Sequence, residues 1–193
     1  MSNKKGRLFV ISGPSGVGKT TLIRLFLKED RLSTFSVSYT TRNKRSHEVH
    51  GRDYYFVDSE VFNSMVERDE FLEWQEVYGY KYGTPRKNVL DVLEQGLDIF
   101  LDIDVNGALH VKNQCPCACL IFIEPPAKEE LQRRLSMRGE REIPKRIKVA
   151  DKEIEKKHAF EYTIVNKELT EAYEEFKGII ESVRRQAHGK NNC

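Results

Sequence analysis

Residues Gly13 to Thr20 read G-P-S-G-V-G-K-T and match the pattern G-x-x-x-x-G-K-[S/T] at every specified position. Glycines at these places let successive backbone N–H groups turn inward around a phosphate. The Lys19 ammonium brings a positive charge to the β- and γ-phosphates, and the Thr20 hydroxyl can ligate Mg²⁺. The residues expected to hold a nucleoside triphosphate are Gly13, Pro14, Ser15, Gly16, Val17, Gly18, Lys19, Thr20 and Thr21.

A second chemical signal is the pair of acids in Leu101-Asp102-Ile103-Asp104, which closes an apolar run. A carboxylate at the end of such a strand can hold Mg²⁺ directly or through water, as the second acid of P-loop enzymes does. Asp102 and Asp104 share one face of the strand if the strand reaches that far; alternatively, one of them only starts a turn. We expect Thr20 and Asp102 to be the metal ligands.

Apolar runs that can form strands alternate along the chain with segments of helical periodicity. The expected strands are 8–12, 35–39, 99–103, 118–123 and 162–165. The expected helices are 20–27, 61–68, 86–95, 128–137, 145–158 and 171–186. This order predicts an α/β fold with a mostly parallel sheet. Ligands bind beyond the carboxyl ends of such strands, where the glycine-rich turn, the acids after Leu101 and Asn166 all lie.

Composition and charge narrow the functional classes. The chain has 193 residues, of which 39% are hydrophobic and 32% charged, which favours a folded domain with a real core. Lys and Arg number 32 against 30 Asp and Glu, and this near balance argues against a dedicated nucleic-acid binder. No apolar run approaches the roughly 18–20 residues of a membrane span, and segment 1–7 does not resemble a secretory signal. We therefore expect a cytoplasmic protein without nucleic-acid or membrane partners.

Three of the four cysteines, Cys115, Cys117 and Cys119, are spaced by two, and the fourth is the last residue, Cys193. On a strand this spacing places the three side chains on one face. Metal sites usually combine C-x-x-C pairs with further ligands, and no second pair is present. The spacing therefore favours a buried or half-buried strand face over a metal site, and a reducing compartment.

The glycine-rich loop fixes the nucleotide but not the reaction. A GTPase would combine it with D-x-x-G and N-K-x-D. The chain contains Asp104-Val105-Asn106-Gly107, but Asn166-Lys167-Glu168-Leu169 lacks the final Asp that would bind the guanine base. The GTPase interpretation is weakened by this loss.

Seven short motifs follow one another between Arg7 and Arg185: GPSGVGKTT at 13–21, SYTTR at 38–42, GRDYYF at 51–56, FLEW at 71–74, YGT at 82–84, LDIDVNG at 101–107 and IVN at 164–166. In this order they resemble the motifs of guanylate kinases, P-loop enzymes that move the γ-phosphate of ATP to GMP. The resemblance implies a P-loop three-layer fold in a single domain. Its parts would be a core (7–37, 87–133 and 147–187), a GMP-binding insertion near 38–86 and a short lid near 134–146.

The resemblance also implies roles for residues on the acceptor side. Residues that would hold the GMP phosphate are Ser38, Arg42, Arg45, Tyr54 and Tyr82. Glu73 and Thr84 match the guanine readers, because a carboxylate accepts from N1–H and the 2-amino group while a hydroxyl donates to O6. Asp104 matches a further acid near GMP. Without the resemblance, Arg42 and Arg45 would be assigned to a solvated loop and Glu73 to the surface.

The segment 133–146 resembles the lid of the family. Arg134, Arg138 and Arg146 align with arginines that reach the triphosphate, and Asn166 with a residue on the ATP side. Lys19, Arg42, Arg138 and Arg146 would stabilise the charge of the transferring group. The stretch between Arg138 and Arg146 is shorter than is typical, which makes the alignment of Arg146 less secure, and Arg141 could take part of its role. Without the resemblance, Arg134 belongs equally well to a solvated helix face.

The resemblance therefore predicts an ATP:GMP phosphotransferase that uses ATP and Mg²⁺ and acts on GMP and dGMP. Two alternatives stay open. One is a kinase for another nucleoside monophosphate, which Glu73 and Thr84 disfavour. The other is a non-catalytic binding module, since some relatives of guanylate kinases serve as scaffolds, typically with eroded P-loops.

Overall fold

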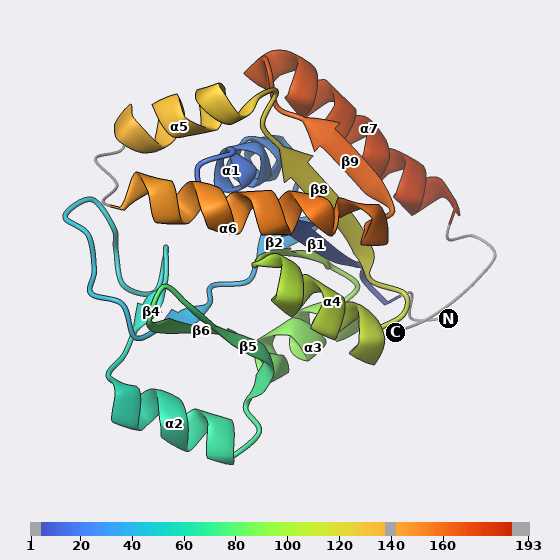
Figure 1. Cartoon of the computed structure of the whole chain (residues 1–193). Coiled ribbons are helices and arrows are strands. Elements are labelled where there is room, and N and C mark those ends of the chain that lie inside the picture. Colours follow the sequence, from blue (N-terminus) through green and yellow to red (C-terminus); the bar gives the residue numbers. More distant parts are fainter. Residues whose placement is uncertain (1–4, 138–141, 187–193) are drawn as a thin grey trace.

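The computed structural model describes residues 5–137 and 142–186, and its centre is a parallel five-stranded sheet (Figure 1). The strand order is β2-β7-β1-β8-β9. The strands are β1 (Leu8–Ser12), β2 (Ser33–Phe35), β7 (Asp98–Asp102), β8 (Cys119–Glu124) and β9 (Tyr162–Val165). Because β1 lies between β7 and β8, the turn that follows β1 lies at the middle of the carboxyl edge of the sheet.

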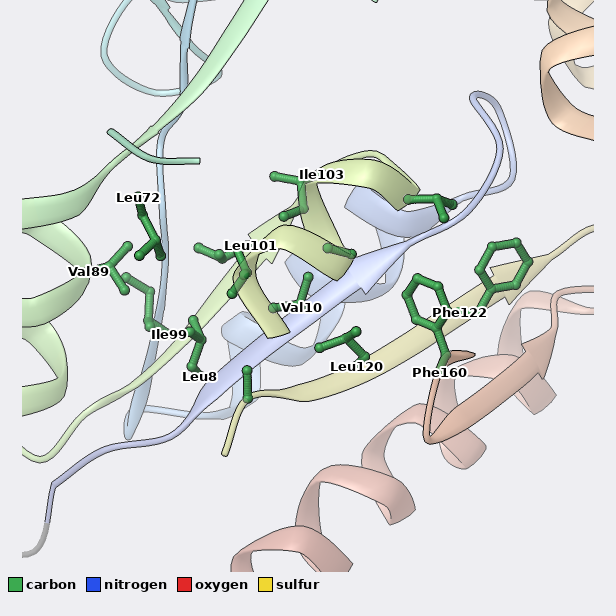
Figure 2. Packing of buried hydrophobic residues seen from close by; sticks show 14 of the residues in the cluster. Leu8, Val10, Leu72, Val89, Ile99, Leu101, Ile103, Leu120, Phe122 and Phe160 are labelled. Atoms are coloured by element: carbon green, nitrogen blue, oxygen red, sulfur yellow. The ribbon is translucent and has the colours of Figure 1, made fainter. Parts of the chain in front are cut away.

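Helices cover both faces of this sheet, which gives three layers. One face packs on α1 (Lys19–Glu29) and α7 (Leu169–Gln186), and the other on α3 (Arg86–Glu94) and α4 (Val105–Gln114). The alternation of strand side chains divides β1 between the two cores, with Phe9 and Ile11 toward α1 and α7. Figure 2 shows the other core, where Leu8 and Val10 meet Leu101 of the neighbouring strand.

A smaller sheet lies to one side of the main sheet, at the lower left of Figure 1. Its strand order is β4-β3-β6-β5, and the strands are β3 (Tyr39–Thr40), β4 (Tyr55–Phe56), β5 (Phe71–Val77) and β6 (Tyr80–Pro85). Helix α2 (Ser59–Glu67) packs on it through a separate cluster of Phe62, Met65 and Phe71. Phe62 and Phe71 stack with ring centroids 4.6 Å apart.

Two further helices, α5 (Lys128–Met137) and α6 (Ile143–Glu155), connect β8 to β9, with the short helix η1 (Lys157–Ala159) after α6. They pack on each other through their own cluster, which contains Leu131, Leu135, Ile147 and Ala150. No helix in the described ranges is long and apolar enough to span a membrane.

The structure confirms the mostly parallel α/β fold and corrects several local expectations. The strand expected at 35–39 is wrong, because β2 and β3 belong to two different sheets. Helix α4 and the β5–β6 hairpin were not predicted. Asp104 does not continue the strand: β7 ends at Asp102, and Asp104 is the N-cap of α4. The cysteines do not share a strand face either, since Cys115 caps the end of α4 and only Cys119 begins a strand.

The core predicts a large effect of truncating Phe100, whose ring stacks on Phe9 at 5.1 Å and is fully buried. We expect Phe100→Ala to lower the free energy of unfolding by about 3–5 kcal/mol, because the cavity it leaves cannot collapse fully. Urea denaturation measures this loss. Leu32→Ala, at a side chain that is 63% exposed, is the control and should change stability little. Equal effects of the two variants would contradict the assigned core.

Candidate active site

The turn after β1 has the backbone that a phosphate cradle needs. Gly13, Gly16 and Gly18 have φ values of 133°, 89° and 104°, a region that side chains with a Cβ rarely adopt. A Cβ on Gly13 would lie 2.0 Å from the carbonyl oxygen of Ile123, and one on Gly18 would lie 2.4 Å from Nδ2 of Asn166. The glycines are therefore required both by backbone conformation and by the closeness of β8 and β9.

Lys19 lies folded over this loop. Its Nζ donates to the carbonyl oxygens of Gly13 at 2.7 Å and Pro14 at 3.2 Å, and it is 3.7 Å from Oδ1 of Asp102. The ammonium group is thus held between the loop and the acid that ends β7. A triphosphate bound in the loop would compete for this charge with two neutral carbonyl oxygens, which are weaker partners than a phosphate.

Thr20 and Asp102 meet at the same edge. The Thr20 hydroxyl donates to Oδ2 of Asp102 at 2.6 Å, and the parallel register that places Asp102 beside Ile11 of β1 brings the two together. A hydroxyl and a carboxylate are oxygen ligands of the kind that Mg²⁺ takes, with its remaining positions filled by phosphate and water. The donor set therefore fits the metal expected at this position.

Two acids, the buried Glu73 and the half-buried Asp104, meet where the small sheet approaches α4. Glu73 of β5 and Thr84 of β6 are paired in register, and the Thr84 hydroxyl donates to Oε1 of Glu73 at 2.5 Å. A Cβ on Gly107 would lie 2.7 Å from Oε2 of Glu73 and 3.0 Å from Oδ1 of Asp104. Gly107 thus lets the carboxylates of Glu73 and Asp104 approach each other over the first turn of α4.

This environment disfavours the ionised form of both acids. Glu73 is only 4% exposed, and burial together with nearby Asp104 raises its pKa to about 7, although hydrogen bonds from Thr84 oppose the shift. Burial also raises the pKa of Asp104, against hydrogen bonds from the backbone of Gly107 and Asn106. A carboxylate with this pKa, aimed into a protected site, is ready to accept hydrogen bonds from a ligand.

Arg42 follows β3 and is held by an acid that the sequence did not single out. Its Nη1 and Nη2 donate to Oε2 and Oε1 of Glu48 at 3.0 and 2.7 Å, a bidentate pair. Burial lowers the pKa of Arg42, but the hydrogen bonds to Glu48 and the neighbouring Tyr82 outweigh it and the net shift is upward. Arg42 is therefore a fixed positive charge, oriented by Glu48.

Aromatic side chains surround this arginine. The guanidinium of Arg42 lies 5.5 Å from the ring centroid of Tyr54, and the rings of Tyr54 and Tyr82 are 5.9 Å apart. Burial raises the pKa of Tyr54, and the negative charge of Asp102 at the end of β7 raises it further. Ser38 is buried just before β3, and the backbone N–H of Arg45 donates to Glu48. Arg42, Tyr54 and Tyr82 thus form one cluster, with Arg45 tied to it through Glu48.

The arginines expected on the ATP side occupy different elements. Arg134 of α5 donates to the carbonyl oxygens of Val17 at 3.4 Å and Asn166 at 3.0 Å, and the Asn166 side chain donates to Val17 at 2.7 Å. Arg146 of α6 donates to the Ser15 hydroxyl at 3.3 Å. Both arginines therefore contact the P-loop, and Arg134 also contacts Asn166. These contacts of Arg134 differ from the alternative that places it on a solvated helix face. Arg138 and Arg141 lie outside the described residues.

Comparisons with known proteins agree on one family. The family model for guanylate kinase matches residues 5–183. The chain belongs to the guanylate kinase family. A guanylate kinase of Syntrophomonas wolfei is 46% identical over 181 residues, which are 92% of this chain and 93% of the relative. One of Thermus thermophilus is 46% identical over 190 residues, 97% and 85% of the two chains.

A solved structure agrees with this assignment. The crystal structure of guanylate kinase from Anaplasma phagocytophilum has a TM-score of 0.78 and 36% sequence identity, and the match covers 93% of this chain and 86% of that one. The P-loop kinase fold expected from the sequence is thereby confirmed.

Sequence reasoning missed three side chains that lie around the site of this family member. Glu48 holds Arg42, and Tyr78 lies against Arg146. Glu153 of α6 is the third: burial raises its pKa to about 7, with Asp104 raising and Lys19 lowering it. Glu48 and Tyr78 stand in loops without a chemical pattern, and Glu153 lies in a helix rich in charges, so neither spacing nor residue type marks them.

The buried Glu73 predicts a stability that depends on pH. An unfolded glutamate ionises near pH 4.5, whereas Glu73 holds its proton to about pH 7, so ionisation destabilises the folded state as the pH rises through this window. We expect Glu73→Gln, which keeps the acceptor for Thr84, to raise the free energy of unfolding at pH 8 by about 3 kcal/mol.

The gain should vanish by about pH 3.5, below the pKa of both states, where folded and unfolded glutamate both bind the proton. Urea denaturation of the ligand-free protein at the two pH values measures it. Glu175→Gln, at an exposed position of α7, is the matched control and should show no such difference. A gain that is equal at both pH values would contradict the assigned cause.

Proposed function

We propose that this chain transfers the γ-phosphate of Mg·ATP to GMP, and to dGMP, giving ADP and the corresponding diphosphate. The observation that carries the proposal is the buried pair Glu73 and Thr84, which faces Asp104 beside an intact phosphate cradle. A cradle alone suits any nucleoside triphosphate enzyme, whereas a buried carboxylate next to a hydroxyl suits a guanine edge.

On the donor side, we assign the triphosphate to the loop 13–21, with Arg134 and Asn166 bracing it from α5 and from the end of β9. Lys19 moves from the loop carbonyls to the phosphates and supplies the nearest positive charge. Thr20 and Asp102 are the residues that would hold Mg²⁺. When bound, the metal neutralises charge on the phosphates.

On the acceptor side, we assign the GMP phosphate to Arg42 and the hydroxyls of Tyr54 and Tyr82, with Ser38 and Arg45 completing the set. A guanidinium already fixed by Glu48 loses little conformational entropy when the phosphate binds. The same fixed charge then meets the negative charge that develops as the phosphoryl group approaches.

The guanine base is assigned to Glu73 and Thr84. An ionised Glu73 accepts from guanine N1–H and the 2-amino group, so GMP binding favours ionisation and lowers the pKa that burial raised. Adenine offers no such pair of donors, and a buried carboxylate would then stay charged without partners or keep its proton. Discrimination against AMP follows from this mismatch.

Catalysis requires that the two anionic substrates meet away from water. We propose three parts: a core (7–37, 87–133 and 147–187), a GMP-binding insertion at about 38–86 and a lid at about 134–146. Closure brings Arg146, and Arg138 within the lid, toward the transferring group, where their charges offset the repulsion between substrates. We also place the reaction in the cytoplasm, where ATP and nucleoside monophosphates are available.

The test is ADP release from Mg·ATP, measured with GMP, AMP, UMP or no acceptor. We expect turnover with GMP and dGMP alone. In Lys19→Ala, turnover should fall by roughly 10²–10³-fold, because one preorganised charge at a transferring group is worth that much. Turnover with another monophosphate would refute the guanine assignment, and ADP release without an acceptor would refute the kinase. Ligand binding without any turnover would favour a binding module.

Glu73 should decide acceptor choice. We expect Glu73→Gln to lower kcat/KM for GMP by about 10²-fold, because its amide N–H₂ faces guanine donors in place of an acceptor. Activity with AMP should stay equal or rise, so the preference for GMP over AMP becomes smaller. Glu76→Gln, at an exposed glutamate on the same strand, is the matched control. An unchanged GMP-to-AMP ratio in Glu73→Gln would remove Glu73 from the base site.

A further inference from the structure

One arginine connects three separate parts of the fold. Arg146 lies in the first turns of α6, and its Nη1 donates to the Ser15 hydroxyl of the P-loop at 3.3 Å. Its guanidinium carbon also lies 4.6 Å from the ring centroid of Tyr78, at the tip of the β5–β6 hairpin. The hairpin, the P-loop and α6 are far apart in sequence, and the two contacts of Arg146 join them.

Tyr78 has a backbone conformation that does not favour tyrosine. Val77 and Tyr80 form the last pair of the hairpin, so Tyr78 and Gly79 are its two-residue loop. Both have positive φ, 54° and 79°, as the favoured hairpin turns require, and Asn or Gly suits this position best. A tyrosine costs backbone energy here. The favourable contact of its ring with Arg146 offsets this cost.

The surroundings of Tyr78 place it next to the proposed acceptor site. Tyr78 lines a cavity of about 230 Å³ together with Asp104 and with Val149 and Glu153 of α6. Asp104 approaches Glu73 over Gly107, so this cavity adjoins the pair assigned to guanine. The same hairpin carries Glu73 and Thr84 on its strands and Tyr78 at its tip. A movement of the hairpin onto GMP therefore moves Tyr78 as well.

We propose that Tyr78 is a positioning residue for phosphoryl transfer: its ring stacks on Arg146 and holds the guanidinium at the P-loop when the hairpin closes over the acceptor. This inference rests on the proposed function and deepens it. An arginine on a flexible stem loses much rotamer entropy when it is fixed, and an aromatic face restricts it before the reaction. Tyr78 thereby makes the charge at the donor phosphates depend on acceptor binding.

Coupling of this kind is reciprocal. If GMP holds the hairpin where Tyr78 meets Arg146, GMP strengthens binding of the triphosphate, and the triphosphate strengthens GMP binding by the same factor. Loss of the ring should leave each substrate able to bind alone, because Tyr78 has no assigned contact with either. We expect the mutual strengthening of binding between the two substrates to disappear and the chemical step to become slower.

The decisive variant is Tyr78→Asn, because asparagine accepts the positive φ and keeps the hairpin folded. We expect kcat to fall about tenfold, with the Kd for GMP alone within about twofold of the wild type. The factor by which GMP strengthens the binding of a non-hydrolysable ATP analogue should fall toward one. Tyr78→Phe keeps the ring and should restore both properties. Tyr80→Ala, at an exposed tyrosine of the same hairpin, is the matched control.

A double-mutant cycle tests whether Tyr78 acts through Arg146. We expect Tyr78→Asn combined with Arg146→Ala to be no slower than Arg146→Ala alone. Additive losses, a Tyr78→Phe variant as slow as Tyr78→Asn, or a Tyr78→Asn variant as fast as Tyr80→Ala would each overturn the role of Tyr78 while leaving the proposed function intact. A wild-type protein that does not phosphorylate GMP would overturn both.

Discussion

The close approach of the P-loop to the ends of three parallel strands is the constraint on which the site depends. Gly13 lies so near the Ile123 carbonyl of β8 that no side chain fits between them, and β7 delivers Asp102 within 2.6 Å of the Thr20 hydroxyl. Both contacts follow from the order β7-β1-β8, which places β1 in the middle. The loop is therefore shaped from outside by the sheet as well as by its own glycines, and residues contributed by other elements meet it at fixed places.

A second principle is that several cations of the site already have partners in this structure. Lys19 donates to loop carbonyls, Arg42 to Glu48, and Arg134 to Glu130 and to backbone oxygens near the P-loop. Such partners hold a long side chain in place. A phosphate can displace a neutral carbonyl oxygen, or it can bind the cation in addition to a carboxylate. Positive charge is thus positioned before the substrates arrive, which lowers the reorganisation needed during the reaction.

The sequence predicted the parts of the molecule whose patterns are local. The P-loop follows from eight consecutive residues, and β1 and β8 follow from apolar runs that are buried on both faces. Strand β9 was also predicted, although it is only partly buried. The small sheet was missed because its strands are short or half-exposed and its β5–β6 turn carries Tyr78 where an Asn-Gly signal is usual. The sequence left open whether Asp104 extends a strand or starts a turn, because an acid that caps a helix and an acid that extends a strand look alike in sequence.

Only those residues of the candidate site that belong to recognisable motifs could be predicted from the sequence. Glu48 and Tyr78 act through other side chains, so their importance depends on tertiary contacts that no spacing encodes. Motifs marked Glu73 and Asp104, but not the raised pKa values of Glu73, Asp104 and Glu153, which come from burial. Burial makes ionisation of Glu73 costly for the folded protein. In the proposed function, a guanine base that donates to Glu73 would relieve part of this cost. The proposed selectivity for guanine and the cost of ionising Glu73 therefore have one physical origin, the removal of a carboxylate from water.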